Sequence, residues 1–223
     1  ENCNGKYIQF IDSDDEPLPN KILEQVKVLE SNQKLLMTYG TTIIGKREDR
    51  MTILGQTNKE KDRISPLFPY QLYWTTSSIL WRRSYISKDS WFPFFGSEDL
   101  LFEFLNGLLD YPIAHTPSEM PLLKKWIHPE NISNNIASDY LYQMEILKCY
   151  DIILKKIIEK NLSSQKKIIA QLYKDKIMFF LVYRRYNEAN YCIYMYQKLI
   201  NKKISIEILA FTFSKWFSIR RTY

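Results

Sequence analysis

Three carboxylates fall within four residues near the start of the chain, at Asp12, Asp14 and Asp15. Repulsion among them is unfavourable unless a cation or a ligand rich in hydrogen-bond donors neutralises their charge. Carboxylate oxygens are hard ligands, and they select Mg²⁺ or Mn²⁺ rather than zinc. The same residue types also suit an Asx turn that leads into a helix, and such turns are common. The acids alone therefore leave a metal site and a plain turn both open.

The pattern around these acids predicts a strand, a loop and a helix. Residues 6–11, KYIQFI, form an aromatic and β-branched run that predicts a buried strand ending at the acids. Asn20 stands where a helix cap is expected, and Ile22, Val26 and Leu29 follow at helical spacing. In an open α/β sheet, ligands gather beyond the carboxyl ends of the strands, which is where this loop would lie.

A second pair of acids, Glu98 and Asp99, opens another predicted helix. Ser97 is a good N-cap, and apolar residues follow it at helical intervals, at Leu100, Leu101, Phe104, Leu105 and Leu108. Acids in the first turn of a helix complement its dipole and need no other reason to be there. Further strands are expected in residues 34–39 and 74–81, and irregular loop or short strands in residues 40–69.

From about residue 138 the pattern is helical throughout. Polar breaks at residues 161–164, around Asn187 and at residues 201–203 predict about four helices. Helices joined by such short breaks pack as antiparallel hairpins. We therefore expect two parts, residues 1–137 and a helical region over residues 138–223.

Charge is distributed unevenly between these two parts. Residues 1–137 hold 15 Lys/Arg against 18 Asp/Glu, and residues 138–223 hold 16 against 7, so the net charges are −3 and +9. The acidic part suits a site that handles a cation, and the basic part suits an anionic partner such as a membrane surface. A solvated helical surface would explain the basic part equally well. Nucleic acid is not expected as a partner, because no stacking motif or reader pattern accompanies the charge.

Other bulk features limit the class of protein. No segment approaches the roughly 18 uninterrupted apolar residues that a membrane span needs, so a soluble protein is expected. Cys3, Cys149 and Cys192 form no CxxC pair, so neither a disulfide framework nor a zinc knuckle is indicated. A cytoplasmic location is expected, with a peripheral position at the inner membrane face as a further interpretation.

Four stretches of the sequence resemble the family 2 glycosyltransferases. Residues 5–26, GKYIQFIDSDDEPLPNKILEQV, are similar to the stretch around the family's DxD motif, with a GxYIxFxDxDD core, a Pro-containing link and a KxxxQ-like helix. Residues 76–85, TSSILWRRSY, are similar to a family strand and its trailing Arg. Residues 91–108, WFPFFGSEDLLFEFLNGL, resemble the segment in which an ED pair opens a helix beneath the acceptor site. Residues 125–133, KWIHPENIS, look like the later segment in which a His precedes Asn-Ile-Ser.

The resemblance covers about residues 5–133 and implies a fold and an activity. The implied fold is α/β, a GT-A-type (Rossmann-like) mixed sheet with flanking helices, and residues 1–137 would be the C-terminal portion of that catalytic domain. Family members normally begin with βα units that bind the nucleotide base, and these N-terminal strands are expected to be missing. The implied activity is an inverting, metal-dependent hexosyltransferase reaction from a nucleotide-sugar donor to a hydroxyl of a saccharide or lipid-linked acceptor, in polysaccharide or glycolipid synthesis.

On the donor side, the resemblance implies roles for four residues. Asp12 and Asp14 would be the two DxD acids, which meet the donor's ribose and the metal-bridged diphosphate. Asp15 would share or take over ligation of the Mn²⁺ or Mg²⁺ ion, and which of Asp14 and Asp15 binds it directly is open. His128 stands where family members with a third protein ligand to the metal supply it.

On the acceptor side, Asp99 is the expected general base. The acceptor hydroxyl is a weak nucleophile, so a carboxylate within hydrogen-bond reach must take its proton during the attack. Glu98 is the neighbour that would substitute for Asp99. Trp91 and Ser97 are expected acceptor contacts.

Two other classes of protein share some of these features. One is a basic helical membrane- or protein-binding module over residues 138–223, with an inactive transferase-like front. The other is a nucleotidyltransferase or metal-dependent hydrolase, which would share the acids at residues 12–15 but not the segments that follow them.

Overall fold

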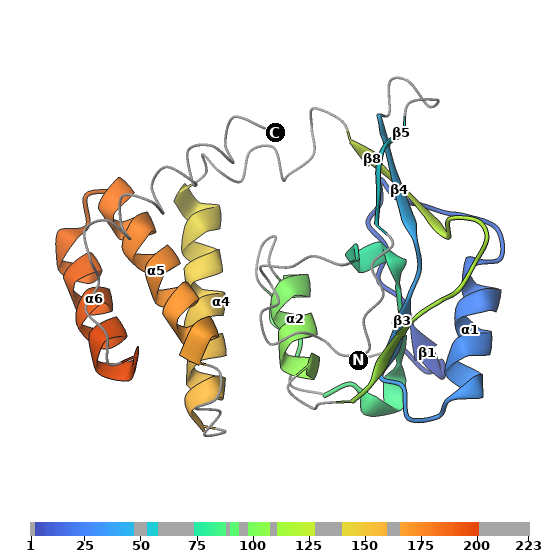
Figure 1. Ribbon diagram of the computed structural model, residues 1–223, viewed down its shortest axis with the longest axis horizontal. Coiled ribbons are helices and arrows are strands. Elements are labelled where there is room, and N and C mark those ends of the chain that lie inside the picture. The colour runs from blue at the N-terminus through green and yellow to red at the C-terminus, as the bar shows by residue number, and fades with distance from the viewer. Residues whose placement is uncertain are drawn as a thin grey trace. The chain divides into compact units, whose positions relative to one another are not determined.

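The structure is a computed structural model that describes residues 3–46, 53–57, 74–87, 90–93, 98–107, 111–127, 140–159 and 166–200. The chain divides into two compact units (Figure 1). The first comprises Glu1–Pro93 and Glu98–Asn131, and it contains all the described strands and two helices. The second comprises Phe94–Ser97 and Ile132–Tyr223, and its described elements are helices.

A four-stranded sheet in the order β1-β6-β3-β7 forms the centre of the first unit. Its strands are β1 (Tyr7–Ile8), β3 (Met37–Tyr39), β6 (Ile79–Arg82) and β7 (Ile113–His115). β6 runs antiparallel to both β1 and β3, whereas β3 and β7 are parallel, so the sheet is mixed. Every residue of β3 and β6 is buried, as expected for strands that are covered on both faces.

Helices cover both faces of this sheet (Figure 1). They are α1 (Lys21–Ser31) and α2 (Glu98–Gly107). On the face of α1, Leu29 packs with Leu35 and Leu80. On the opposite face, Phe102 of α2 belongs to a larger cluster that includes Met37, Tyr39, Ile79 and Trp81. Because side chains alternate along a strand, Leu80 and its neighbours in β6 serve opposite faces.

A second four-stranded sheet has the order β2-β8-β4-β5. Its strands are β2 (Glu16–Pro17), β4 (Thr42–Lys46), β5 (Ile53–Thr57) and β8 (Leu123–Ile127). β2 pairs antiparallel with β8, and β8 pairs parallel with β4. Since β2 directly follows the acids at residues 12–15, the pairing of Glu16 with Lys124 brings β8 beside the acid-rich loop.

The second unit contains α4 (Tyr140–Glu159), α5 (Lys166–Val182) and α6 (Tyr186–Ile200). α4 is held by a buried apolar stripe that includes Leu147, Ile153, Leu154 and Ile157. α5 and α6 pack against each other. The break predicted around Asn187 lies a few residues earlier, where Arg184 has a φ of 56°. Within the described part of the chain, no helix combines the length and apolar character that crossing a bilayer requires.

The predicted α/β class, with a mixed sheet, flanking helices and a helical C-terminal region, is confirmed. Local details differ from prediction. The strand predicted over residues 6–11 is limited to β1, and residues 76–78 form a 3-10 turn, η1 (Thr76–Ser78), instead of strand. The Ser78 N–H and hydroxyl both donate to the Thr75 carbonyl, at 2.8 and 2.7 Å, which favours a turn over a strand ladder. Asn20 precedes α1 as predicted, but its side chain makes no capping hydrogen bond.

α1 buries two polar residues beside its predicted apolar positions Val26 and Leu29, which pack in the core, and only Ile22 of the predicted apolar positions is exposed. Ile22 is 46% exposed, whereas Lys21 and Gln25 are buried. The Gln25 amide donates to the Ser78 carbonyl at 2.7 Å and to the Thr38 carbonyl at 3.3 Å. The Lys21 ammonium donates to Gln25 Oε1 at 2.8 Å, and burial lowers the pKa of Lys21 to about 7. These bonds fix α1, the helix after the acid-rich loop, against β3 and η1.

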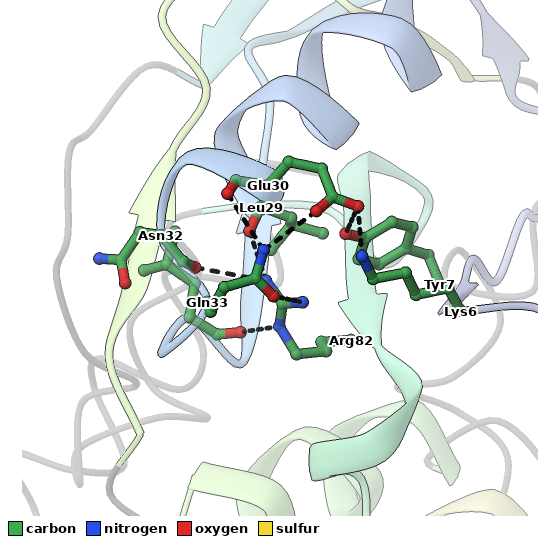
Figure 2. Close-up of polar contacts among 8 residues, drawn as sticks. Lys6, Tyr7, Leu29, Glu30, Asn32, Gln33 and Arg82 are labelled. Atoms are coloured by element: carbon green, nitrogen blue, oxygen red, sulfur yellow. Dashed lines mark hydrogen bonds and ion pairs between the residues drawn. The ribbon is translucent and has the colours of Figure 1, made fainter.

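Arg82 fixes the C-terminal end of α1 against the same sheet (Figure 2). It is the last residue of β6 and is buried. Its Nε donates to the Leu35 carbonyl at 2.9 Å, and its Nη1 donates to Gln33 Oε1 at 3.0 Å. Its Nη2 donates to the carbonyls of Leu29 and Asn32. Carbonyls at a helix end have no intrahelical partner, so the guanidinium satisfies groups that would otherwise be orphaned.

Side chains of Lys6 and of Tyr7, the first residue of β1, join the same end of α1. Glu30 accepts hydrogen bonds from Lys6 Nζ at 2.5 Å and from the Tyr7 hydroxyl at 2.7 Å (Figure 2). The bonds from Lys6 and Tyr7 lower the pKa of Glu30 to about 2. The Arg82 guanidinium lies 5.6 Å from the centroid of the Tyr7 ring. β1, which leads to the acids, is therefore held by both α1 and β6.

Replacing Arg82 by Lys is expected to destabilise the chain by about 2–4 kcal/mol, because an ammonium cannot satisfy the same set of buried carbonyls. Chemical denaturation followed by circular dichroism measures the free energy of unfolding. Arg83→Lys is the matched control, because Arg83 is the exposed neighbour in sequence. This control is expected to change the free energy of unfolding by less than about 0.5 kcal/mol. Equal losses in the two variants would contradict the structural role of Arg82.

Candidate functional site

The acids at residues 12–15, here called the acid turn, form a tight turn held against η1. The Asp15 N–H donates to the Asp12 carbonyl at 3.1 Å, which closes the turn. The Asp12 N–H donates to the Ser77 hydroxyl at 2.9 Å. Gln9, just before the turn, donates from its amide to the Ser77 carbonyl at 3.2 Å. Ser77 is fully buried, so an interior residue fixes the position of the acids.

Asp99 reaches the same 3-10 turn from α2. The Thr76 hydroxyl donates to Asp99 Oδ2 at 2.8 Å. Thr76 and Ser77 are neighbours in sequence, so the acid turn and the first turn of α2 contact adjacent residues of η1. Burial raises the pKa of Asp12, and the charge of Asp99 adds to this shift. The two carboxylates therefore lie within electrostatic reach of each other.

The acid turn combines partial burial with mutual repulsion. Burial raises the pKa of Asp15, the Ser77 hydroxyl and the Lys125 ammonium oppose the rise, and the charges of Asp12 and Asp14 add to it. Lys125 opposes the raised pKa of Asp12 in the same way. Lys125 lies on β8, so the pairing of β2 with β8 supplies a cation beside the acids.

Asp15 is the acid whose surroundings best fit a bound ligand. Both of its carboxylate oxygens are buried, and neither is held in a hydrogen bond of standard geometry among the described residues, although the Ser77 hydroxyl lies close enough to lower the pKa of Asp15. Buried polar atoms are normally paired, so an unpaired carboxylate at a surface turn fits a cation or a donor-rich ligand. Over the same described residues, no group of three or more His, Cys, Asp or Glu could hold a metal ion alone. Any metal here would need ligands from a bound substrate or from outside those residues.

Trp91 places an aromatic ring beside the stretch that leads to the acid turn. It stacks on Phe10, with ring centroids 4.9 Å apart and an interplanar angle of 17°, and meets the edge of Phe102 at 5.6 Å. Trp91 is 48% exposed. An aromatic ring that is packed on one side and open on another can stack on a sugar ring.

The remaining predicted site residues are placed as follows. Asp14 lies in the middle of the acid turn, and Glu98 stands next to Asp99 in the first turn of α2. One carboxylate oxygen of Glu98, Oε2, is buried and unpaired among the described residues. Ser97 and His128 lie outside the described residues. The catalytic, metal and substrate roles of all these residues stay predictions.

The family of the segment that carries the acid turn can be identified. Residues 1–88 match the model of glycosyl transferase family 2. The predicted resemblance is confirmed over these residues. The matched segment contains the acid turn and η1, whereas α2 and Asp99 lie beyond it.

Two solved structures resemble the chain at a coarser level. They are the crystal structure of S. aureus TarS 1-349 and that of S. aureus TarS 1-349 in complex with UDP. Each is 12% identical to this chain with a TM-score of 0.41, and they cover 90% and 89% of this chain and 67% of their own. A likeness this distant assigns no role to any residue here. None of the curated proteins matches the sequence significantly.

Glu103 is a buried acid that the sequence analysis does not single out. It lies on α2 one helical turn after Asp99, is 3% exposed, and accepts a hydrogen bond from Trp74 Nε1 at 2.8 Å. Burial raises the pKa of Glu103 to about 8 against the opposing bonds from Trp74 and Thr76, and the charge of Asp99 adds to the rise. Its signal in the sequence is its spacing, four residues after Asp99 on the same predicted helix. Lys125 and the hydroxyl residues of η1 lie within the stretches that resemble the family, but their residue types and spacing alone do not predict a place in the site.

The pKa of Glu103 predicts a pH dependence of stability. Between about pH 4.5 and about pH 8 the folded chain keeps the Glu103 proton and the unfolded chain releases it, so this contribution to stability falls as pH rises. Glu103→Gln removes the contribution, so the variant should gain stability relative to the natural chain as pH rises across this interval. Denaturation at several pH values measures the difference, with Glu119→Gln, an exposed loop residue, as the control. A difference that does not change with pH would refute the neutral state of Glu103.

Proposed function

We propose that this chain is part of an inverting, metal-dependent glycosyltransferase of the hexosyltransferase type, which uses a nucleotide-sugar donor and a hydroxyl acceptor. One observation carries the proposal: the acid turn, inside the segment that matches family 2, and Asp99 of α2 contact adjacent residues of η1. Transfer requires the donor and the acceptor to meet in one oriented site. A shared support for the donor-side acids and the acceptor-side base meets that requirement.

On the donor side, Asp12 and Asp14 are proposed to meet the ribose and the metal-bridged diphosphate. The acid turn begins at a backbone bond to Ser77, which holds Asp12 in a fixed place. Lys125 brings positive charge to the same turn, where it would help to balance the diphosphate.

The residues present fit a hard divalent cation. The unpaired oxygens of Asp15 are suitable ligands, and Mg²⁺ is commonly held by one or two carboxylates together with substrate phosphates. Asp14 and Asp15 would hold Mn²⁺ or Mg²⁺, and His128 is a proposed third ligand. When bound, the cation would stabilise the negative charge that develops on the leaving diphosphate.

On the acceptor side, Asp99 is the proposed general base. Its Oδ2 accepts a bond from Thr76, which would orient the other carboxylate oxygen toward an acceptor hydroxyl. A single displacement at the anomeric carbon needs only one base and inverts the configuration, whereas a retaining hydrolase needs a second carboxylate as nucleophile. Glu98 is the proposed substitute for Asp99, and Trp91 and Ser97 are proposed acceptor contacts.

The acceptor is proposed to be a saccharide or a lipid-linked saccharide, in polysaccharide or glycolipid synthesis. The division into a catalytic part over residues 1–137 and a basic helical region over residues 138–223 is part of this proposal. α6 exposes Tyr191 and Tyr194, with Lys198 in its last turn. Tyrosine and basic residues favour the interface of a membrane, so we propose peripheral contact with the inner face of a membrane, in the cytoplasm.

Replacing Asp99 by Asn is expected to lower transfer by about 10³-fold, because the amide cannot accept the acceptor's proton. The measurement is release of nucleoside diphosphate from a panel of nucleotide sugars with Mn²⁺ or Mg²⁺. Glu119→Gln removes an exposed carboxylate elsewhere in the unit and should leave the rate unchanged. Full activity of a folded Asp99→Asn variant would exclude this residue as the base. Loss of function only on charge reversal in residues 138–223 would instead favour the binding-module alternative.

Replacing Asp15 by Asn is expected to weaken the effect of divalent cations on the binding of nucleoside diphosphate. The amide keeps the size of the side chain but lacks the charge that attracts a cation. Titration of nucleoside diphosphate binding with Mn²⁺, followed by calorimetry, should show coupling between the two ligands in the natural chain. The coupling should fall by at least about tenfold in the variant, the usual scale for losing a metal ligand's support. Equal coupling in both proteins would remove Asp15 from the metal site.

A further inference from the structure

Among the residues that the structure describes, Glu103 is the strongly buried carboxyl near η1 to which the proposed reaction assigns no role. It lies one helical turn after Asp99, so the two side chains lie on the same side of α2. The Trp74 indole donates to Glu103 Oε2 at 2.8 Å, and the Thr76 hydroxyl lies close enough to act on the same carboxyl. Thr76 also donates to Asp99 Oδ2 at 2.8 Å. Thr76 therefore stands between two acids.

The chemistry of a hydroxyl limits what Thr76 can do. It has one proton to donate, so it can serve only one of the two carboxyls as donor, although its oxygen can accept from the other. If both acids were ionised, they would compete for that proton and repel each other in a region of low dielectric. If Glu103 is neutral, its own proton can be donated to the Thr76 oxygen, and the Thr76 proton stays on Asp99.

We propose that Glu103 is a positioning residue that, as a neutral acid, keeps the Thr76 hydroxyl directed at Asp99. The inference rests on the proposed function, in which Asp99 is the base. Trp74 N–H, Glu103 O–H and Thr76 O–H would then form one directed chain that ends on the Asp99 carboxylate. Every donor in this chain has one acceptor.

The surroundings of Glu103 favour the neutral form. It is 3% exposed, and the pKa raised by its burial to about 8 keeps it protonated at neutral pH. The charge that acts on it comes from Asp99 on its own helix, and the same Asp99 charge acts on Asp12 of the acid turn. Behind Trp74, Tyr39 and His115 are the titratable groups of the neighbouring strands. Above about pH 8 Glu103 ionises, competes for the Thr76 proton and repels Asp99, so transfer should decline.

The test is the pH profile of kcat/KM for transfer by the full chain, measured from about pH 6 to pH 9. The natural chain should lose activity with an apparent pKa near 8, or about tenfold at one pH unit above that value. Glu103→Gln is neutral at every pH, so its profile should lack this alkaline decline. The exposed Glu119→Gln should keep the decline of the natural chain. Identical profiles for the natural chain and Glu103→Gln would overturn the inference while leaving the proposed function intact.

A second variant covers the case in which Glu103→Gln does not fold. The indole hydrogen bond from Trp74 lowers the pKa of Glu103. Trp74→Phe removes that bond and so raises this pKa, and the alkaline decline in activity should move to higher pH. A decline that stays in place, or moves to lower pH, would overturn the inference. Absence of transfer by the natural chain at every pH, with every donor, would overturn the proposed function and this role with it. If Glu103 were purely structural, Glu103→Gln would lower activity by the same factor at every pH, and that result would also count against the inference.

Discussion

Negative charge collected around one 3-10 turn is the constraint on which the rest of the site depends. The Asp12 N–H donates to Ser77 of η1, and the Asp99 carboxylate accepts from Thr76 of η1. Glu103 also lies close to the Thr76 hydroxyl. Like charges at such separations cannot all remain ionised without compensation. The compensation comes from several sources: hydroxyls of η1, the ammonium of Lys125, burial that raises the pKa of Glu103, and, in the proposed function, a divalent cation at Asp15.

The scaffold explains how the turn keeps its place. β6 continues directly from η1 and is buried along its whole length, and it pairs with β1 on one side and β3 on the other. Gln25 and Arg82 then tie α1 to this sheet by bonds to backbone carbonyls, while Phe102 packs α2 on the other face. The acids are consequently carried by loops and helix ends, but their positions are set by the register of central strands. The central strands therefore hold the carboxylates in place against their mutual repulsion.

Much of this could be predicted from the sequence, for reasons of local pattern. The acid turn between a strand and a helix, the start of α2 at Glu98 and the helical C-terminal region follow from periodicity and capping residues that lie close together in the chain. The burial of Lys21 and Gln25 on α1, the 3-10 form of η1 and the burial of Glu103 could not be predicted. They depend on contacts between residues far apart in sequence, such as Gln25 with Ser78 and Trp74 with Glu103. Local propensity favours the burial of apolar Ile22, but Gln25 is buried instead, and its amide donates to the carbonyls of Thr38 in β3 and Ser78 in η1.

The central claim is that the acid turn and Asp99 serve one site, with a cation on one side and the acceptor on the other. The most direct measurement is a crystal structure of the chain with Mn²⁺ and a nucleoside diphosphate, in which the anomalous signal of manganese locates the ion. We expect manganese bound to the carboxylate of Asp14 or Asp15 and to the diphosphate, with Asp99 across the space that a donor sugar would occupy. Manganese and diphosphate bound away from the acid turn, or an Asp99 carboxylate turned into a separate region, would contradict it.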